Sequence, residues 1–247
     1  MLKEERQSYI VKQINLHNKV LSSDLSSELN VSEDTIRRDL NELAENGKIL
    51  KVYGGALSKS FHSPFTENET YAKDSKREIA KKTLRLIKDE MILLVGGGTT
   101  MIEIARMVPK NLKCTFFTVS PLVGLELVEN TNIEVILLGG QLSSNSHIST
   151  GSMVVNQLSD IQVDLCLLGT NGLSIDTGIT DSDMEVVQVK KAMIKCAKKT
   201  AIISIAEKLN SVQKMKVCNL NAINYLITDL DPSDEALKGY SKFVTLL

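Results

Sequence analysis

The sequence predicts an α/β protein with two domains, a small winged helix-turn-helix over residues 1–57 and a mainly parallel, Rossmann-like domain over residues 75–247. Three short helical patterns and a strand ending in two glycines fill the first part. From residue 74 onward, helical segments alternate with short apolar runs, the order expected of βαβ units. The chain has 247 residues and 43% hydrophobic content. That is enough for one large and one small core.

The first two helices are predicted from their apolar spacing. One runs from about Lys3 to Asn15, with Ile10 and Ile14 on one face. In the next, leucines recur at helical spacing behind a predicted cap at Ser22-Ser23, and Asn30 marks its end. Only Asn30 and Val31 separate this helix from the third, so the two helices form a helix-turn-helix.

The third helix opens at Ser32, whose hydroxyl can accept from backbone N–H groups of the first turn, and ends at Asn46-Gly47. Apolar residues recur at i, i+4 and i+7 and must face the other helices. Three residues are thereby turned at least partly outward, and they are Thr35, Arg37 and Arg38.

Two guanidinium groups and hydroxyls on the N-terminal half of such a helix fit DNA recognition, because Arg bonds guanine or phosphate and Ser or Thr reach phosphate or base edges. The alternative is a solvated face on which Arg37 or Arg38 pairs with Asp34 or Glu42. Residues 48–53 alternate like a strand and end in Gly54-Gly55, which predicts a wing. Lys51 and Tyr53 would face the sugar-phosphate backbone.

Charge alone does not predict a nucleic-acid partner. The net charge is −1, and residues 1–57 hold eight basic against nine acidic side chains. Binding to double-stranded DNA must therefore depend on how charge is placed, and on doubling it in a homodimer or homotetramer.

Other features narrow the class. No apolar run is long enough for a membrane span and no secretory signal is visible, so we expect a cytoplasmic protein. The cysteines and histidines share no metal-ligand spacing, and we expect no metal and no cofactor. Residues 58–74 break the pattern and predict a linker, although their aromatic residues also fit an ordered arm.

The stretch from Val31 to Ala56, VSEDTIRRDLNELAENGKILKVYGGA, resembles the signature of DeoR-type bacterial repressors. The helix-turn-helix, the Thr-Ile-Arg-Arg-Asp-Leu core and the Gly-Gly of the wing occur together and in order. The resemblance implies that Ser32, Thr35, Arg37 and Arg38 face the operator. Asp39 is assigned to orienting an Arg or to pairing within the helix, because phosphate would repel a carboxylate.

In the second domain, Asp74 is expected to cap a helix reaching about Asp89. Strands are expected at 91–95, 114–119, 133–138, 163–168, 200–205 and 225–228, and helices near 99–108, 121–130, 152–160, 182–198 and 233–239.

A glycine-rich loop follows the first of these strands and leads directly into a helix. Gly97 and Gly98 allow close backbone approach, and Thr99 and Thr100 add hydroxyl donors at a helix N-terminus, which together outline a phosphate site. The loop is neither a Walker motif nor a dinucleotide fingerprint. A turn that serves only strand-helix packing is the alternative.

Further strand ends should meet at the same carboxyl edge, where ligands bind in open α/β sheets. Lys208 is a lone cation there, and an exposed surface lysine is its alternative. The other predicted effector residues are Ser120, Gly140, Gly169, Asn171, Gly172 and Gly178.

This domain also resembles the DeoR-type sensor domain, similar in fold to ribose-5-phosphate isomerase and other sugar-phosphate isomerases. The usual Asp-x-Gly-Thr-Thr, Thr-Asn and Ser-Lys motifs appear here with Gly96 in place of the aspartate, as Ser120-Pro121, and as Glu207-Lys208. The matching residues still predict a phosphate site. The replacement of the aspartate by Gly96 affects which effector the site would recognise.

Together these features predict a DNA-binding regulator, a repressor of sugar or related carbon metabolism genes, controlled by a phosphorylated sugar or related metabolite. The alternative is a working sugar-phosphate isomerase with a DNA-binding appendage. Its candidate acids are Asp176, Asp181 and Glu185. Because the glycine loop and the segment LLGTNG contain no acid, binding without turnover is favoured.

Overall fold

The computed structural model describes residues 1–17, 19–58, 71–130 and 133–247. It divides into two compact units, Met1–Tyr71 and Ala72–Leu247. The predicted linker lies largely outside the described residues. No described helix is both long and apolar enough to cross a membrane.

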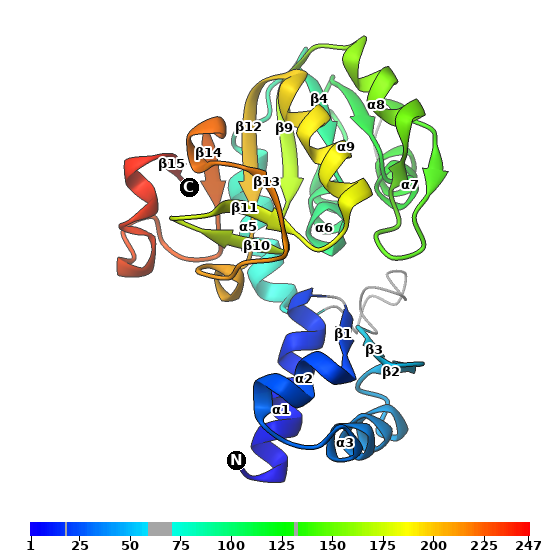
Figure 1. Cartoon of the computed structure of the whole chain (residues 1–247). Coiled ribbons are helices and arrows are strands. Elements are labelled where there is room, and N and C mark those ends of the chain that lie inside the picture. The colour runs from blue at the N-terminus through cyan, green and yellow to red at the C-terminus, as the bar shows by residue number, and fades with distance from the viewer. Residues whose placement is uncertain (18, 59–70, 131–132) are drawn as a thin grey trace. The chain divides into compact units, whose positions relative to one another are not determined.

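The N-terminal unit has the predicted helix-turn-helix and wing (Figure 1). Strand β1 pairs with β3, and β3 pairs with β2, both antiparallel. β1 has three residues, too few for the sequence pattern to indicate it. The elements are α1 (Lys3–His17), β1 (Lys19–Leu21), α2 (Ser22–Leu29), α3 (Glu33–Glu45), β2 (Leu50–Val52) and β3 (Gly55–Leu57).

The caps of this unit agree with the sequence at α3 but not at α2. Ser32 caps α3 and accepts a hydrogen bond from the Thr35 backbone N–H, as predicted. Gly47, just beyond the end of α3, has φ +68°, the left-handed conformation that glycine adopts without a Cβ penalty. The predicted Ser22-Ser23 cap is wrong, because α2 already includes both serines and its N-cap is Leu21, with no side-chain bond.

A small apolar core joins the three helices of the N-terminal unit. Ile10 and Ile14 of α1 are fully buried, and Ile36 and Leu40 of α3 are at most 1% exposed. Leu25 of α2 completes the contact. The i, i+4, i+7 row of α3 thus faces inward, which fixes the opposite side of that helix toward solvent.

The larger unit is built on a seven-stranded sheet in the order β15-β14-β12-β9-β4-β5-β6, and every ladder in it is parallel. This confirms the predicted mainly parallel α/β fold. Its strands are β4 (Ile92–Val95), β5 (Thr115–Thr118), β6 (Glu134–Leu137), β9 (Val163–Gly169), β12 (Ala197–Ile203), β14 (Tyr225–Ile227) and β15 (Thr245–Leu246).

Helices cover both faces of this sheet. Helix α9 crosses in front of β9 in Figure 1, and α5 and α6 lie behind. Because all ladders are parallel, the carboxyl ends of the strands meet at one edge, the lower edge in Figure 1. The helices are α5 (Lys73–Leu84), α6 (Thr99–Met107), α7 (Pro121–Asn130), α8 (Ser152–Ser159) and α9 (Met184–Lys195).

Three details differ from the sequence prediction. Residues 233–239 form no α-helix, because Pro232 and Gly239 leave room only for a 3-10 turn at Glu235–Leu237. Asp74 lies inside α5 rather than capping it. Helix α9 begins at Met184, since Asp183 caps it by accepting from the Glu185 and Val186 N–H groups.

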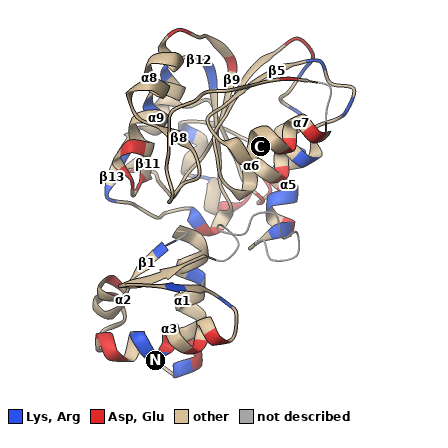
Figure 2. Cartoon of the chain, turned by 90° about the vertical axis from the view of Figure 1, so that its right-hand side faces the viewer, with Lys and Arg blue, Asp and Glu red and all other residues tan. Residues whose placement is uncertain are grey.

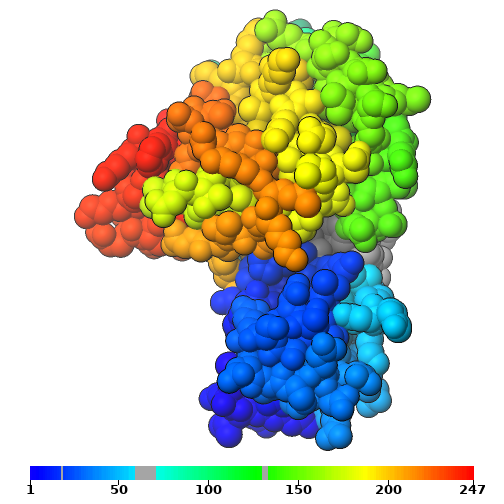
Figure 3. Space-filling model, viewed as in Figure 1, coloured from blue at the N-terminus to red at the C-terminus, as the bar shows by residue number. Residues whose placement is uncertain are grey.

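The sequence pattern also missed two small antiparallel sheets. One has the order β10-β11-β13, with β10 (Gly172–Ser174), β11 (Gly178–Asp181) and β13 (Met215–Cys218). Figure 3 shows the yellow-green hairpin beside the orange strand at the surface. The other pairs β7 (Gln141–Leu142) with β8 (Ser149–Thr150). Such short strands carry too little alternation to separate them from loops.

Candidate functional sites

The outer side of α3 presents the side chains predicted to face DNA. Arg37 and Arg38 are exposed, and Ser32 and Thr35 hydrogen-bond to each other through their hydroxyls at 2.9 Å. Arg37 also pairs with Asp34 at 3.0 Å, and both side chains are more than 60% exposed. An ion pair so open to water contributes about 0–1 kcal/mol, so it leaves Arg37 available to another anion.

Asp39 points away from this surface. It is 2% exposed and accepts from Arg6 Nε of α1 at 2.5 Å, with Gln7 Nε2 at 3.3 Å. The hydrogen bond from Arg6 to Asp39 raises the pKa of the guanidinium. Pairing within the helix was the wrong alternative for Asp39, because the partner comes from α1. The carboxylate is thereby removed from the face that would repel phosphate.

Figure 2 shows acidic and basic residues interleaved along α1 and α3. The hairpin of β2 and β3 adds two of the predicted contacts. Lys51 is exposed, and Tyr53 is fully exposed at 106%. Gly54 turns the hairpin with φ +76°. An aromatic side chain without packing at a hairpin tip is available for an outside surface.

In the larger unit, the glycine loop lies at the carboxyl edge of the sheet. A Cβ on Gly97 would lie 2.4 Å from Ile148 Cγ2, and Gly98 has φ +107°, so both positions require glycine. Thr99 and Thr100 begin α6 and are partly exposed. The loop therefore presents the first-turn N–H groups of a helix and two hydroxyl-bearing residues at an open sheet edge.

The structure brings Gly169 and Ser120 close to this loop. The Cβ position of Gly169 lies 3.7 Å from the Gly97 carbonyl oxygen, and that of Gly97 lies 3.4 Å from Ser120 Cβ. Ser120 is 1% exposed, and its hydroxyl lies 3.4 Å from the His147 carbonyl that it donates to. It is placed beside the loop but mostly covered.

At three other predicted glycines, close packing leaves no room for a Cβ atom. A Cβ on Gly140 would lie 2.7 Å from the Thr150 carbonyl oxygen, one on Gly172 2.5 Å from Thr180 Oγ1, and one on Gly178 2.2 Å from the Cys218 carbonyl oxygen. Gly172 and Gly178 belong to the small sheet. Their part in ligand binding stays a prediction, whereas their packing follows directly from the geometry.

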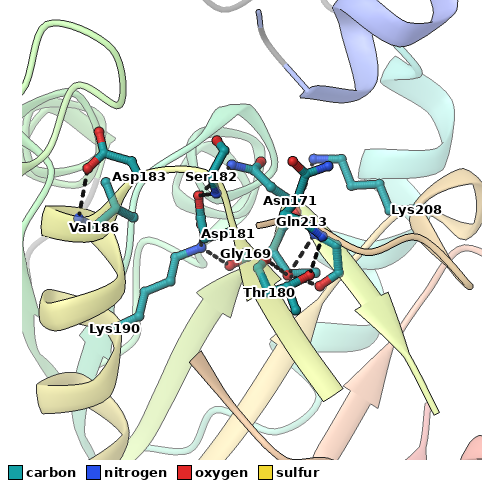
Figure 4. Close-up of polar contacts among 12 residues, drawn as sticks. Gly169, Asn171, Thr180, Asp181, Ser182, Asp183, Val186, Lys190, Lys208 and Gln213 are labelled. Carbon is teal, nitrogen blue, oxygen red and sulfur yellow. Dashed lines mark hydrogen bonds and ion pairs between the residues drawn. The ribbon is translucent and has the colours of Figure 1, made fainter. Parts of the chain in front are cut away.

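A buried polar network next to the loop was not predicted as a unit (Figure 4). Asp181 of β11 is 1% exposed and accepts from Lys190 Nζ at 2.7 Å and from Asn171 Nδ2 at 2.9 Å. Lys190 also donates to the Gly169 carbonyl at 2.8 Å. Burial alone would raise the pKa of Asp181, but the Lys190 charge and these hydrogen bonds outweigh it and lower the pKa.

One feature of the sequence indicates this buried network. Val186, Lys190 and Met193 stand at i, i+4 and i+7 of α9, so a lysine occupies the apolar face of the helix. A charged residue on a buried helical face needs a partner, because an unpaired buried charge is costly. From sequence alone, Asp181 is a candidate acid of the isomerase alternative and not a partner for this lysine.

Lys208 is partly buried rather than an exposed surface lysine, so that alternative is wrong. Its Nζ donates to the Thr170 carbonyl, 3.1 Å away, next to Gly169 (Figure 4). Burial, and to a smaller extent the Lys190 charge, lower the pKa of Lys208 to about 8 against the opposite effect of Asp181. Within the described residues, no group of three or more His, Cys, Asp or Glu could hold a metal ion.

Two family models cover most of the chain. One, described as the DeoR-like helix-turn-helix domain, matches residues 6–61, and the other, the DeoR C-terminal sensor domain, matches residues 72–230. The chain belongs to the DeoR family.

Two similar proteins support this membership. The HTH-type transcriptional regulator GolR of Listeria innocua is 31% identical over 97% of this DeoR-family chain and 94% of its own length. The glycerol-3-phosphate regulon repressor of Escherichia coli is 26% identical over 94% of the chain and 93% of its own length. Both are named as transcriptional regulators and not as enzymes. This DeoR-family chain is accordingly a transcriptional regulator, and the isomerase alternative is not supported.

Among solved structures, ribose 5-phosphate isomerase A of Methanocaldococcus jannaschii matches with a TM-score of 0.41 and 18% identity. The match covers 56% of this DeoR-family chain and 55% of the isomerase.

Proposed function

We propose that this protein is a sequence-specific repressor of sugar or related carbon metabolism genes, and that a phosphorylated metabolite controls its affinity for operator DNA. The observation that supports operator recognition most is the two-sided α3. Its apolar row is buried while Arg37 and Arg38 are exposed, on a helix that follows a short turn from α2. Ser32, Thr35, Lys51 and Tyr53 complete the proposed DNA surface.

The effector site is proposed at the carboxyl edge of the parallel sheet. The glycine loop offers backbone N–H groups and hydroxyls to a phosphate from Gly97, Gly98, Thr99 and Thr100. Lys208, which lies beyond the end of strand β12, adds a positive charge. Asn171, with Asp181 and Lys190 beside it, supplies polar groups for the rest of the ligand. The remaining predicted glycines shape the loops around these groups.

We further propose a homodimer or homotetramer. Residues 1–57 carry nine acids against eight bases, so one copy offers little electrostatic attraction to DNA. Two copies joined by symmetry would double the contacts, and operator half-sites would mirror that symmetry.

The experiment is fluorescence anisotropy of the full chain on DNA from upstream of its own gene, with added phosphorylated compounds and their unphosphorylated parents. Glycerol 3-phosphate and hexose phosphates are the probes, and glycerol and the free hexoses are the controls. We expect tight binding to this DNA, weak binding to scrambled DNA, and a change in affinity with phosphorylated compounds only.

A matched variant locates the phosphate site. Replacing Thr99 and Thr100 together by Ala should weaken the response to the active phosphorylated compound without changing DNA affinity in its absence. An equal response to the unphosphorylated parent would contradict phosphate control. An unchanged effector response in the double variant would move the site away from the glycine loop.

A further inference from the structure

One side of the larger unit carries exposed apolar side chains that neither proposed site uses. They come from residues 121–159, whose green segments run along one side of the unit in Figure 3. Scattered exposed leucines are common on proteins, whereas a group on one side marks an interaction surface. Five large apolar side chains here are between 49% and 63% exposed, and we call them the β6 surface: Leu125, Val128, Leu137, Leu142 and Met153.

The first part of the β6 surface lies on α7, beside the edge of the parallel sheet. Glu126 of α7 faces α6, because it accepts from Arg106 Nη2 at 2.8 Å. Val128 stands two residues further along the helix, about 200° around its axis, and so points away from α6. Since the sheet ends in the order β4-β5-β6, the side of α7 that faces away from α6 faces the β6 edge.

The second part lies on the other face of the sheet and is joined to the same edge. Gln157 of α8 donates through Nε2 to the Gly139 carbonyl at 2.8 Å and accepts from the Gly139 N–H at 3.3 Å, just beyond the end of β6. Met153 precedes Gln157 by one helical turn, and Leu142 lies on β7 three residues after Gly139. Both α7 and α8 lie on this side in Figure 1, and Figure 2 looks onto it.

The sequence of this region is without positive charge. Residues 114–189 contain no Lys or Arg, although the chain has 29 of them. The charged residues within 121–159 are Glu126, which is paired with Arg106, and Glu129 and Glu134. Because Lys, Glu and Asp are depleted from the core of protein interfaces, this composition favours an apolar contact. A positively charged partner would find only two acids that are not already paired with Arg106.

The strand edge itself indicates what kind of partner fits. Within the described residues, β6 forms a ladder only with β5. The N–H groups of Glu134 and Leu138 donate toward β5, at 3.3 and 2.8 Å, so those of Val135 and Leu137 point to the outer side. An open edge of this kind pairs with another extended strand. A second copy related by a two-fold axis supplies the same strand in antiparallel orientation.

We propose that two copies of this chain pair through β6 in antiparallel orientation, with the β6 surfaces of both copies packed against each other. The inference rests on the proposed homodimer or homotetramer and assigns its contact. Antiparallel pairing places Glu134 of each copy opposite the Leu137 end of the other, so the two acids stay apart. A stable dimer buries about 800 Å² on each partner, more than a four-residue strand supplies, so α7 and α8 take part in the contact.

The test is sedimentation equilibrium of the full chain, with circular dichroism to verify folding. Leu137→Lys places a charge on the edge strand, which opposes strand pairing. The dissociation constant of this contact should rise at least roughly 30-fold, the effect of losing one hot-spot residue, so a dimer should become a monomer and a tetramer a dimer. Val212→Lys is the matched control, because Val212 is 54% exposed but lies before β13, and it should associate as the wild type does.

A second variant and a second measurement make the test decisive. Leu125→Lys with Val128→Lys changes only exposed positions of α7 and takes the place of Leu137→Lys if that variant fails to fold. Hydrogen exchange of residues 134–137 should be slow in the assembled wild type and faster in the variants. Folded variants that associate as the wild type does, or a fast-exchanging β6 in the assembled wild type, would overturn the inference and move the contact to another surface. A monomeric wild type would leave this face to a different protein and refute the proposed homo-oligomer as well.

Discussion

Replacing Arg37 and Arg38 together by Ala tests the recognition surface most directly. Each well-placed Arg contact to a base is worth about 1–3 kcal/mol, so losing two should cost about 2–6 kcal/mol per head. At 1.4 kcal/mol per factor of ten, operator affinity should fall roughly 30-fold to 20,000-fold. Folding should be nearly unaffected, because both side chains are exposed and the Arg37–Asp34 pair is open to water.

The assay is fluorescence anisotropy on operator DNA at several salt concentrations, with circular dichroism to verify folding. Lys110 and Lys113, exposed in the larger unit, give the matched control, and their double Ala variant should bind as the wild type does. A folded Arg37/Arg38 double variant that keeps operator affinity within about threefold would refute the recognition-helix assignment, since a tenfold loss already corresponds to only 1.4 kcal/mol.

Three further predictions concern other parts of the chain. Arg6→Met leaves the Asp39 carboxylate buried without its guanidinium partner, so the N-terminal unit should lose about 3–5 kcal/mol of stability. The loss is measured as faster hydrogen exchange in α3, and unchanged exchange would show that the Arg6–Asp39 ion pair does not stabilise this unit. Tyr53→Ala should weaken DNA binding and leave the melting temperature unchanged, because the side chain is fully exposed. Burial, and to a smaller extent the Lys208 charge, lower the pKa of Lys76 to about 7 against the opposite effect of Glu103. Between pH 7 and about 10 the unfolded chain holds a proton on Lys76 that the folded chain lacks, so stability should rise with pH by up to about 1.4 kcal/mol per unit, and Lys76→Met should remove that part of the slope.

Most of the N-terminal unit could be predicted because its signals are local. Ser32 caps the helix that it immediately precedes, and Gly47 ends it, so both boundaries follow from neighbouring residues. The apolar period of α3 then fixes which side faces out. The ion pair of Asp39 could not be predicted in this way, because its partner Arg6 is 33 residues away and no local pattern connects them.

The parallel sheet was also predictable, since each strand is a short apolar run between helices. The polar groups of the site were not, because they meet only through tertiary structure. Lys190 and Asp181 come from different elements and are joined across the edge of the sheet. Lys76 lies in a helix whose sequence is rich in lysine, and nothing local distinguishes it from the exposed Lys81. Burial makes the difference, and burial depends on what packs against the helix.

The placement of charges in the N-terminal unit explains how a segment without an excess of basic residues can bind DNA. Asp39 is neutralised inside by Arg6, and Lys3 pairs with Glu42, while Arg37, Arg38, Lys48 and Lys51 remain exposed. With Arg37 and Arg38 reading bases, Lys48 and Lys51 give two phosphate contacts per head and a slope of log affinity against log salt of about −1.8, or roughly a 12-fold loss between 50 and 200 mM salt. Two heads on one operator would double the slope to about −3.6. A measured slope near −1.8 for the full chain would therefore mean that a single head binds, and would remove the argument for symmetric pairing.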